Sequence, residues 1–371
     1  MKLRNLCISC GGTGGHFYPG LAVAREWKRQ NGNVLLLLGG KHAEKQSQIA
    51  ASYGIDSVRI RAEGLSLHPV RLAGFFLALV RGFLQSRKAF KTFQADALLC
   101  MGSFASVPPL LAAKFCKVPY FLHDGNARLG KTTLKFGSSA RALALSFPTP
   151  DGEKSKACQR ELTGMPLRRE LLEKIPSGEE ALARINAQWN CKFTPERKVL
   201  LIFGGSLGAA SINENCRIAA DFPQKEKIQL IHLTGSGKLH DLQEYYKDAD
   251  FPVLLLESSP DMQLFYAAAD WIVCRAGGST VSEVACFGKY ALLVPYPFAT
   301  EDHQSYNARY LTEGGGAELI RDDTLSQELF TEKLCSFLSD TESYRLKGLC
   351  NRDRAFPDAA QRVLNLIQSN L

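Results

Sequence analysis

The residues best suited to chemistry lie in one glycine-rich segment near the amino terminus, Gly11-Gly12-Thr13-Gly14-Gly15-His16. An apolar stretch at 6–10, typical of a strand, precedes the segment, and a helical pattern at 21–27 follows it. Glycines between a strand and a helix let backbone N–H groups approach a pyrophosphate, and the helix start favours negative charge there. The histidine adds a titratable group, so the segment predicts a diphosphate site beside a proton acceptor.

Three later segments repeat parts of this pattern: 204–210 after an apolar run, 274–283, and 295–308. In the second, Glu283 stands about two turns into the expected helix, where a carboxylate can accept both hydroxyls of a ribose; the alternative is a solvated helix face. In the third, Gln304 suits sugar hydroxyls, and the alternative is an ordinary polar helix start capped by Thr300.

The elements that must position these turns alternate between strand and helix. Strands are expected at 3–10, 33–38, 57–60, 97–101, 118–122 and 142–147, and then at 199–203, 228–233, 253–256, 271–274 and 291–294. We therefore expect an α/β protein with two doubly wound, Rossmann-like parallel sheets facing across a cleft. The expected domains are 1–165 and 166–355, with a polar hinge at 148–169 and a last helix, 356–371, packing back on the first domain.

Charge and cysteine content narrow the class of protein. Residues 1–168 carry 24 Lys and Arg against 9 Asp and Glu, whereas 169–371 carry 21 against 28. No nucleic-acid-binding motif accompanies the basic half, so an anionic membrane surface is the expected partner rather than nucleic acid. The 11 scattered cysteines indicate a cytosolic protein with reduced thiols, and Cys7 and Cys10 are expected to be buried strand residues rather than a redox pair. The aspartates of Lys247-Asp248-Ala249-Asp250 are not expected to bind a metal.

A helical apolar stripe over 65–93 could meet that membrane. It consists of Leu72, Phe75, Phe76, Leu79, Val80 and Phe83, flanked by arginines and lysines. Arg71 and Arg81 are too close together for the stripe to span a bilayer, but it could lie in the interface with its cations on lipid head groups. The alternative, a helix packed on the sheet, remains open.

The order and spacing of four motifs are typical of one protein family. The motifs are GGTGGHxxPG, GGSxGA, RAGGSTVSE and DHQxxNA. From Leu6 to about Ala360 the chain resembles the MurG family, membrane-associated transferases that add N-acetylglucosamine to lipid-linked muramyl-pentapeptide. The resemblance implies a GT-B fold, with UDP-N-acetylglucosamine on the second domain and the polyprenyl-diphosphate-linked acceptor on the first. It implies a peripheral enzyme at the cytoplasmic face of the membrane, active in peptidoglycan synthesis, with no metal and no other cofactor.

The resemblance also implies roles for individual residues. It implies that the uridine is bound by Ser206, Arg275 and Glu283. The donor diphosphate would be bound by Arg168 and the backbone at Gly277, Gly278 and Ser279, and the sugar by Asn126 and Gln304. Near the acceptor diphosphate it gives Thr13, Gly14, Gly15 and His16, and on the acceptor or membrane side Gly102, Ser103, Phe75, Phe76, Leu79 and Phe83. The chain departs from the usual family pattern at Phe104, Gly125, Met165 and Leu207.

The expected reaction is an inverting transfer in which the acceptor 4-hydroxyl attacks the anomeric carbon of the donor sugar. His16 is either the general base or a group that orients the diphosphate, while arginines and helix starts stabilise the departing UDP. One alternative is a lipid-directed transferase of the same fold with diacylglycerol as acceptor. A nicotinamide oxidoreductase and a non-catalytic binding protein fit the combined motifs less well.

Overall fold

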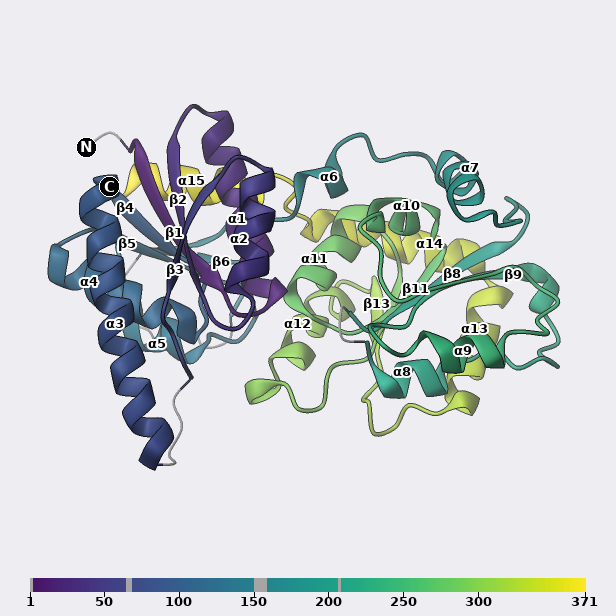
Figure 1. Ribbon diagram of the computed structural model, residues 1–371. Helices are drawn as coiled ribbons and strands as arrows, with labels where there is room; N and C mark the ends of the chain where they lie inside the picture. Colours follow the sequence, from purple (N-terminus) through teal and green to yellow (C-terminus); the bar gives the residue numbers. More distant parts are fainter. Residues whose placement is uncertain (1–2, 65–68, 150–158, 206–207) are drawn as a thin grey trace. The chain divides into compact units, whose positions relative to one another are not determined.

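The computed structural model describes residues 3–64, 69–149, 159–205 and 208–371, with only the backbone of 69–73. The chain forms two compact units, Met1–Arg168 with Phe356–Leu371, and Arg169–Ala355 (Figure 1). The first unit thus runs three residues beyond the expected residue 165. The last helix of the chain belongs to this first unit.

Unit 1 is built on a parallel sheet whose described strands follow the order β3-β2-β1-β4-β5-β6-β7. Their bounds are Asn5–Gly11 (β1), Asn33–Gly39 (β2), Asp56–Ile60 (β3), Ala97–Cys100 (β4), Tyr120–Asp124 (β5), Ala142–Leu145 (β6) and Gln159–Leu162 (β7). The first six lie within two residues of the strands expected from sequence. The polar stretch 148–169, expected as the hinge, contains a strand that the sequence did not predict, β7. This strand pairs only at the sheet edge, where polar residues replace the continuous apolar run of a central strand.

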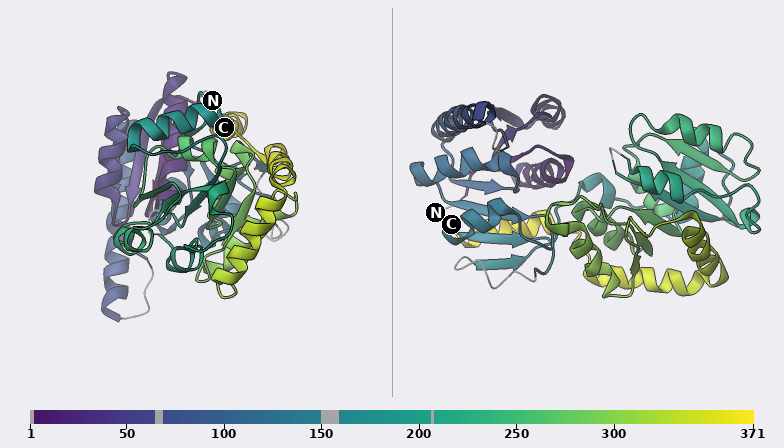
Figure 2. Two further views of the ribbon diagram at one scale, coloured as in Figure 1. Left: turned by 90° about the vertical axis from the view of Figure 1, so that its right-hand side faces the viewer. Right: turned by 90° about the horizontal axis from the view of Figure 1, so that it is seen from below.

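Helices cover both faces of this sheet (Figure 2). The described helices are Gly14–Arg29 (α1), Ala43–Ser52 (α2), Pro69–Phe93 (α3), Phe104–Ser106 (η1), Val107–Cys116 (α4), Lys131–Phe136 (α5), Gly137–Ser139 (η2) and Ala359–Ser369 (α15). Apolar residues of α1, α2 and α15 pack on one face, and those of α3, α4 and α5 pack on the other. Cys10 joins the first core and Cys7 the second, because side chains of a strand alternate between faces.

Both thiols of this CxxC sequence are reduced and buried, which confirms the expectation of strand cysteines. Burial raises the pKa of the Cys7 and Cys10 thiols to about 12. The thiolate, which is the reactive form of cysteine, is therefore strongly disfavoured at both positions.

Unit 2 repeats the architecture with the described strand order β10-β9-β8-β11-β12-β13, again all parallel. Its strands are Lys198–Phe203 (β8), Ile228–Leu233 (β9), Val253–Leu256 (β10), Trp271–Cys274 (β11), Ala291–Leu293 (β12) and Ala317–Leu319 (β13). The sequence did not predict β13, which is only three residues long and half-buried at the sheet edge.

The described helices of unit 2 include Arg169–Leu172 (α6), Gly178–Trp189 (α7), Ala210–Asn215 (α8), Lys225–Lys227 (η4), Leu239–Tyr245 (α9), Met262–Ala268 (α10), Gly278–Phe287 (α11), Thr300–Asp302 (η5), His303–Thr312 (α12), Gln327–Ser339 (α13), Thr341–Leu349 (α14) and Cys350–Arg354 (η6). The core centres on Trp271, whose ring stacks on Phe330 at 6.2 Å and on Phe337 at 5.4 Å. These contacts fix α13 against the first and fourth strands of the unit, β8 and β11.

The residues of the apolar stripe on helix α3, which could meet a membrane, differ in how exposed they are. Of the four residues assigned to the acceptor or membrane side, Phe76 is exposed, whereas Phe75, Leu79 and Phe83 are partly buried, so the stripe is shared between a packed side and an exposed side of the helix. The reason is the set of small buried residues on α3: a Cβ on Gly82 would lie 2.1 Å from the Arg61 carbonyl oxygen and 2.9 Å from the Pro108 Cβ. That close approach turns the flanking residues inward. Among the residues of α3 whose side chains the structure describes, the large apolar ones left exposed are Phe76, Leu77, Val80 and Leu84.

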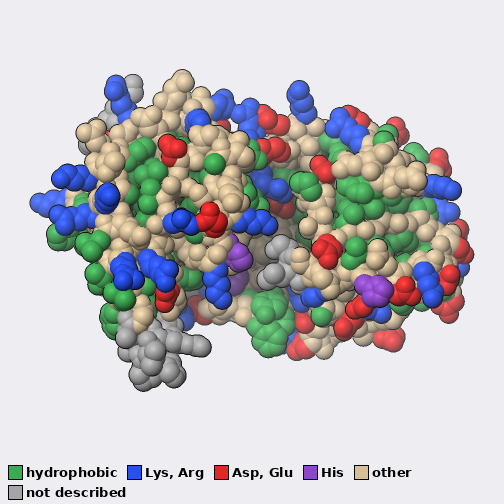
Figure 3. All heavy atoms as spheres, viewed as in Figure 1, with side chains coloured by type: hydrophobic (Ala, Val, Ile, Leu, Met, Phe, Trp, Pro, Cys, Tyr) green, Lys and Arg blue, Asp and Glu red, His purple; other side chains and the backbone are tan. Residues whose placement is uncertain are grey.

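Among the helices that the structure describes, none is both long enough and apolar enough to cross a membrane. In the face shown in Figure 3, lysine and arginine side chains gather over unit 1, whereas acidic and basic side chains mix over unit 2. The surface thus carries the charge difference between the two halves of the sequence.

Candidate active site

The strand order of unit 1 reverses at β1, which has β2 on one side and β4 on the other. Ligands of open parallel sheets bind beyond the carboxyl ends of the strands at such a reversal. There β1 runs into the glycine segment, and β4 runs into Met101, Gly102 and Ser103. The fold therefore brings together residues 13–16 and 102–103, which the sequence separates by more than 80 positions.

The glycine segment makes its turn through two residues in the left-handed region. Gly11 has φ 131° and Gly12 has φ 82°. A Cβ on Gly11 would also lie 2.6 Å from the Gly39 carbonyl oxygen, so this position excludes a side chain on two grounds.

Helix α1 begins at Gly14, inside the segment, and not near Leu21 as expected from sequence. Within the described chain no side chain caps this helix start, and its first turn carries no acidic residue. The backbone N–H groups and the positive end of the helix dipole thus face outward at Gly14 and Gly15, where an anion is stabilised. Thr13 is the residue before the helix and is exposed.

His16 lies in the first turn of α1 and is held by β4. Its Nδ1 lies 2.7 Å from the Met101 carbonyl oxygen, which can only accept, so the ring carries its proton on Nδ1. In the neutral ring the basic lone pair is then on Nε2. Gly102, next to this carbonyl, has φ 81°, a left-handed conformation that favours glycine, and its backbone lies beside the His16 ring. The geometry fits a general base whose tautomer is set by the backbone.

Two buried titratable residues at the end of β5 stand within electrostatic range of His16, and sequence reasoning gave neither of them a role. The pKa of His123 is lowered to about 4, mainly by burial and to a smaller extent by the charge of His16, while a hydrogen bond with the Gly164 carbonyl opposes the shift. Burial raises the pKa of Asp124, while hydrogen bonds from Thr133, Gly130 and Asn126 oppose that shift. The feature that could have identified His123 and Asp124 is their position at the carboxyl end of an expected strand.

Asp124 also shapes the loop that carries Asn126. Its Oδ2 accepts a hydrogen bond from the Gly130 backbone N–H at 2.9 Å, and its Oδ1 accepts one from the Asn126 N–H at 3.3 Å. The neighbouring Gly125 packs on Met165: a Cβ at residue 125 would lie 3.0 Å from the Met165 Cε. These two departures from the family pattern are therefore in contact, and the small residue makes room for the large one.

Arg168 ends the first of the two chain segments that form unit 1. Its guanidinium carbon lies 5.4 Å from the centre of the Tyr18 ring, a cation–π contact that holds the side chain near α1. Tyr18 also contacts the glycine turn, since a Cβ on Gly14 would lie 3.5 Å from its ring. Arg168 is thus tied through Tyr18 to the same helix start as His16.

Unit 2 has its own reversal, at β8, between β9 and β11. Beyond β11 the chain passes Arg275 and Gly277 and starts α11 at Gly278. As at α1, the described residues include no side chain that caps α11 and no acid in its first turn. The N–H groups around Gly278 and Ser279 are therefore suited to a phosphate.

The guanidinium of Arg275 is the centre of a network. It forms an ion pair with Asp322, donates from Nη2 to the Ser211 Oγ at 3.0 Å, and donates from Nη1 to the carbonyl oxygens of Val294 and Pro295 at 3.2 Å each. The network joins the end of β12 and the chain after β13 to the start of α8. The role of Arg275 in binding uridine stays a prediction. The structure shows that Arg275 holds the backbone at Val294 and Pro295 in place. Sequence reasoning missed Asp322 and Ser211, because 47 and 64 residues separate them from Arg275.

Glu283 lies on α11 and faces α10. The Tyr266 hydroxyl donates to its Oε2 at 2.8 Å, and Tyr266 itself is fully buried. The contact orients the carboxylate and excludes the reading of Glu283 as a simple solvated helix residue. Tyr266 is a second residue that the sequence did not single out.

Gln304 and Ser206 complete the predicted set. The Gln304 Oε1 accepts a hydrogen bond from the Tyr296 backbone N–H at 2.9 Å, which fixes the amide at the start of α12. Thr300 begins the short η5 helix and is not an N-cap. Ser206 and Leu207 lie outside the described residues.

Comparison with known proteins gives the same result for both units. Residues 6–144 match the N-terminal domain of glycosyltransferase family 28, and residues 199–363 match its C-terminal domain. A UDP-N-acetylglucosamine–N-acetylmuramyl-(pentapeptide) pyrophosphoryl-undecaprenol N-acetylglucosamine transferase of Geobacter sulfurreducens is 33% identical, with 97% of each chain covered. The namesake enzyme of Coxiella burnetii is 32% identical, with 98% of this chain and 97% of the relative covered.

Among solved structures, MurG of Acinetobacter baumannii aligns with a TM-score of 0.76 and 26% identity, covering 99% of each chain. A UDP-N-acetylglucosamine 2-epimerase of Neisseria meningitidis, at 13% identity and a TM-score of 0.68, shares the fold. The two parallel α/β units thus form a GT-B fold. The chain belongs to the MurG family within glycosyltransferase family 28 and is a glycosyltransferase.

Proposed function

We propose that this protein moves N-acetylglucosamine from UDP-N-acetylglucosamine to the 4-hydroxyl of a lipid-linked N-acetylmuramyl-pentapeptide, with inversion at the anomeric carbon. The observation that carries the proposal is the hydrogen bond between the His16 Nδ1 and the Met101 carbonyl at the reversal of the first sheet. This hydrogen bond leaves the His16 Nε2 as the basic nitrogen, next to the anion-binding start of α1. A diphosphate-linked acceptor needs both a proton acceptor and an anion site. The names of the relatives support the same reaction.

In the proposed step, the acceptor oxygen bonds to the anomeric carbon as the bond from that carbon to the UDP oxygen breaks. The hydroxyl proton passes to the His16 Nε2, and UDP leaves with the bonding electron pair. Thr13, Gly14 and Gly15 bind the acceptor diphosphate. Gly278 and Ser279 at the start of α11, with Arg168, stabilise the charge on the departing UDP.

On the donor side, the proposal assigns Glu283 to the ribose hydroxyls, Arg275 and Ser206 to the uridine, and Asn126 and Gln304 to the sugar. Unit 1 is then the acceptor domain and unit 2 the donor domain. The orientation of Glu283 by Tyr266 supports this assignment, because a fixed carboxylate pays less entropy on binding.

The proposal places the enzyme at the cytoplasmic face of a membrane, as a peripheral protein on anionic lipid. Support comes from the exposed apolar residues Phe76, Leu77, Val80 and Leu84 on α3 and from Arg81, Arg87 and Lys88 on the same helix. Apolar side chains that insert at the interface and cations that meet lipid head groups are the two signals such binding needs.

The test is transfer of labelled N-acetylglucosamine to a lipid-linked muramyl-pentapeptide analogue, with EDTA present and diacylglycerol as competing acceptor. Label on the muramyl lipid is the expected result, and EDTA should not abolish it, because arginines and helix starts carry the leaving-group charge. Label on diacylglycerol alone would replace the proposed acceptor with a glycerolipid.

A further inference from the structure

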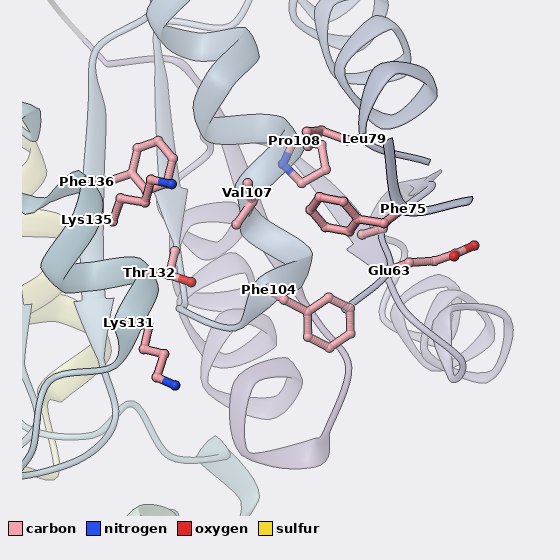
Figure 4. A pocket seen from close by; sticks show the side chains of 11 residues that line it. Glu63, Phe75, Leu79, Phe104, Val107, Pro108, Lys131, Thr132, Lys135 and Phe136 are labelled. Carbon is pink, nitrogen blue, oxygen red and sulfur yellow. The ribbon is translucent and has the colours of Figure 1, made fainter. Parts of the chain in front are cut away.

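Unit 1 contains a pocket that the transfer step above does not use. It lies between α3, the η1–α4 segment and α5 and has a volume of about 200 Å³ (Figure 4). Its walls are largely apolar: Phe75 and Leu79 come from α3, Phe104 from η1, and Phe136 from α5. A cavity of about 150 Å³ accepts benzene, so this one has room for a short branched hydrocarbon.

The charges of the pocket are arranged on opposite sides. Lys131 and Lys135 project from α5 and are exposed, while Glu63 lies on the far side, near Phe75, with its carboxylate pointing away from the lysines (Figure 4). Glu63 is also paired with Arg61 at 3.6 Å. An apolar interior with two cations at one edge suits an amphiphile whose anionic head follows directly after its hydrocarbon.

The wall of the pocket is linked to the glycine turn through residues 102–104. The Thr132 Oγ1, in the pocket wall, donates to the Ser103 carbonyl oxygen at 3.2 Å. The Ser103 Oγ lies 3.3 Å from where a Cβ on Gly12 would stand, and Gly102 contacts His16 in the same way at 3.4 Å. The three residues 102–104 therefore join the wall of the pocket to the proposed general base.

We propose that this pocket binds the isoprenoid segment next to the diphosphate of a polyprenyl diphosphate, with Lys131 and Lys135 against the diphosphate charge. The inference rests on the proposed function and extends it, because it assigns the first part of the lipid carrier to a cavity in the protein rather than to the bilayer. The membrane-facing residues Phe76, Leu77, Val80 and Leu84 do not line the pocket.

The first experiment compares farnesyl diphosphate with inorganic diphosphate by calorimetric titration of the full chain, without vesicles or detergent and below the aggregation concentration of the lipid. Burial of even one isoprene unit predicts that farnesyl diphosphate binds at least about tenfold more tightly. Leu79→Gln should remove most of this preference. Leu77→Gln, the same change two residues earlier at an exposed site, is the matched control and should keep it.

A second pair of variants tests the cations. The double variant Lys131→Gln, Lys135→Gln should weaken both ligands by about tenfold at low salt, since both carry the diphosphate. The control Lys45→Gln, Lys91→Gln removes the same charge from exposed positions outside the pocket and should change neither affinity. Binding of UDP by every variant checks that the chain is folded.

Equal affinity for farnesyl diphosphate and inorganic diphosphate would overturn the inference, as would an equal loss in Leu77→Gln and Leu79→Gln. Transfer to the muramyl lipid, measured on the same preparation, separates this failure from failure of the proposed function. Transfer without a farnesyl preference would refute the pocket alone. A farnesyl preference without transfer would refute the acceptor assignment and keep the pocket.

Discussion

The carboxyl ends of β1 and β11 have similar backbone structures but differ in the side chains that surround them. Strand β1 is the strand at which its sheet reverses, and β11 pairs with β8, the reversal strand of the second sheet. Each of the two strands is followed by glycines and by a helix that has no side-chain cap and no acid in its first turn among the described residues. Beyond β1 stands a histidine held by a backbone carbonyl. Beyond β11 stand an arginine in a network of four partners and a carboxylate oriented by a buried tyrosine.

The difference shows how one backbone arrangement serves two tasks. Both helix starts supply the general attraction for phosphate, which depends on N–H groups and the helix dipole and not on side chains. Under the proposed function the side chains divide the chemistry: proton transfer is assigned to unit 1, and recognition of the nucleoside is assigned to unit 2. Replacing a side chain at one helix start should therefore affect one task and spare the other.

The largest effect is expected from His16→Ala. Loss of a general base should lower kcat by roughly 10²- to 10⁴-fold, whereas the dissociation constant for UDP should change little. Steady-state transfer kinetics and calorimetric titration with UDP measure the two quantities. A large loss of UDP affinity with modest loss of kcat would instead make His16 a diphosphate ligand and would break the division between the units.

Glu283→Ala should show the reverse pattern. Loss of a charged hydrogen-bond acceptor costs about 1.5–3 kcal/mol, so UDP should bind roughly 10- to 100-fold more weakly. Glu328→Ala, which removes an exposed carboxylate elsewhere in unit 2, is the control and should leave UDP binding unchanged. Unchanged UDP affinity in Glu283→Ala would remove the ribose role.

Each unit also contains a buried neutral histidine, which makes stability depend on pH. Burial lowers the pKa of His123 to about 4 and that of His232 to about 3, below the ordinary value of 6.5. Between about pH 6.5 and pH 4 these two histidines are protonated in the unfolded chain but remain neutral in the folded one. The free energy of unfolding should therefore fall as the pH falls. Each histidine should remove about 2 kcal/mol between pH 7 and pH 5.

Urea unfolding at the two pH values measures this loss. His123→Gln and His232→Gln should each reduce the pH dependence, and His240→Gln, at an exposed histidine, should not. In unit 1 the raised pKa of Asp124 acts in the opposite direction, so the slope should be smaller there than in unit 2. A pH dependence that survives both substitutions would contradict the assignment.

The smallest effect is expected from Tyr266→Phe. The variant keeps the buried ring but removes the hydroxyl that donates to Glu283, a contribution of about 1 kcal/mol. UDP should bind about fivefold more weakly, with kcat nearly unchanged. In the Glu283→Ala background the same substitution should have no further effect on UDP binding, and an additive loss would show that the two residues act independently.

Much of the fold was predictable because strands and glycine turns leave local signals. The apolar runs of β2 and β8 are continuous, as is typical of buried parallel strands, and those of β1 and β9 are interrupted only by Ser9, Gln229 and His232. The edge strands β7 and β13 were missed, because an edge strand is half-exposed and needs no such run. The start of α1 was placed too late, because Gly14, Gly15 and Pro19 are poor helix formers that packing nevertheless holds in a helix.

The sequence by itself determined the glycine turns, the parallel α/β architecture, the family, and the candidate residues His16, Arg275 and Glu283 to which the proposed function assigns the chemistry. Only the tertiary structure decided which backbone and side-chain groups support them. Met101 reaches His16 across 85 residues, Asp322 reaches Arg275 across 47, and Gly82 decides which face of α3 is exposed. These contacts arise from strand order and close packing between distant segments, which no local pattern records.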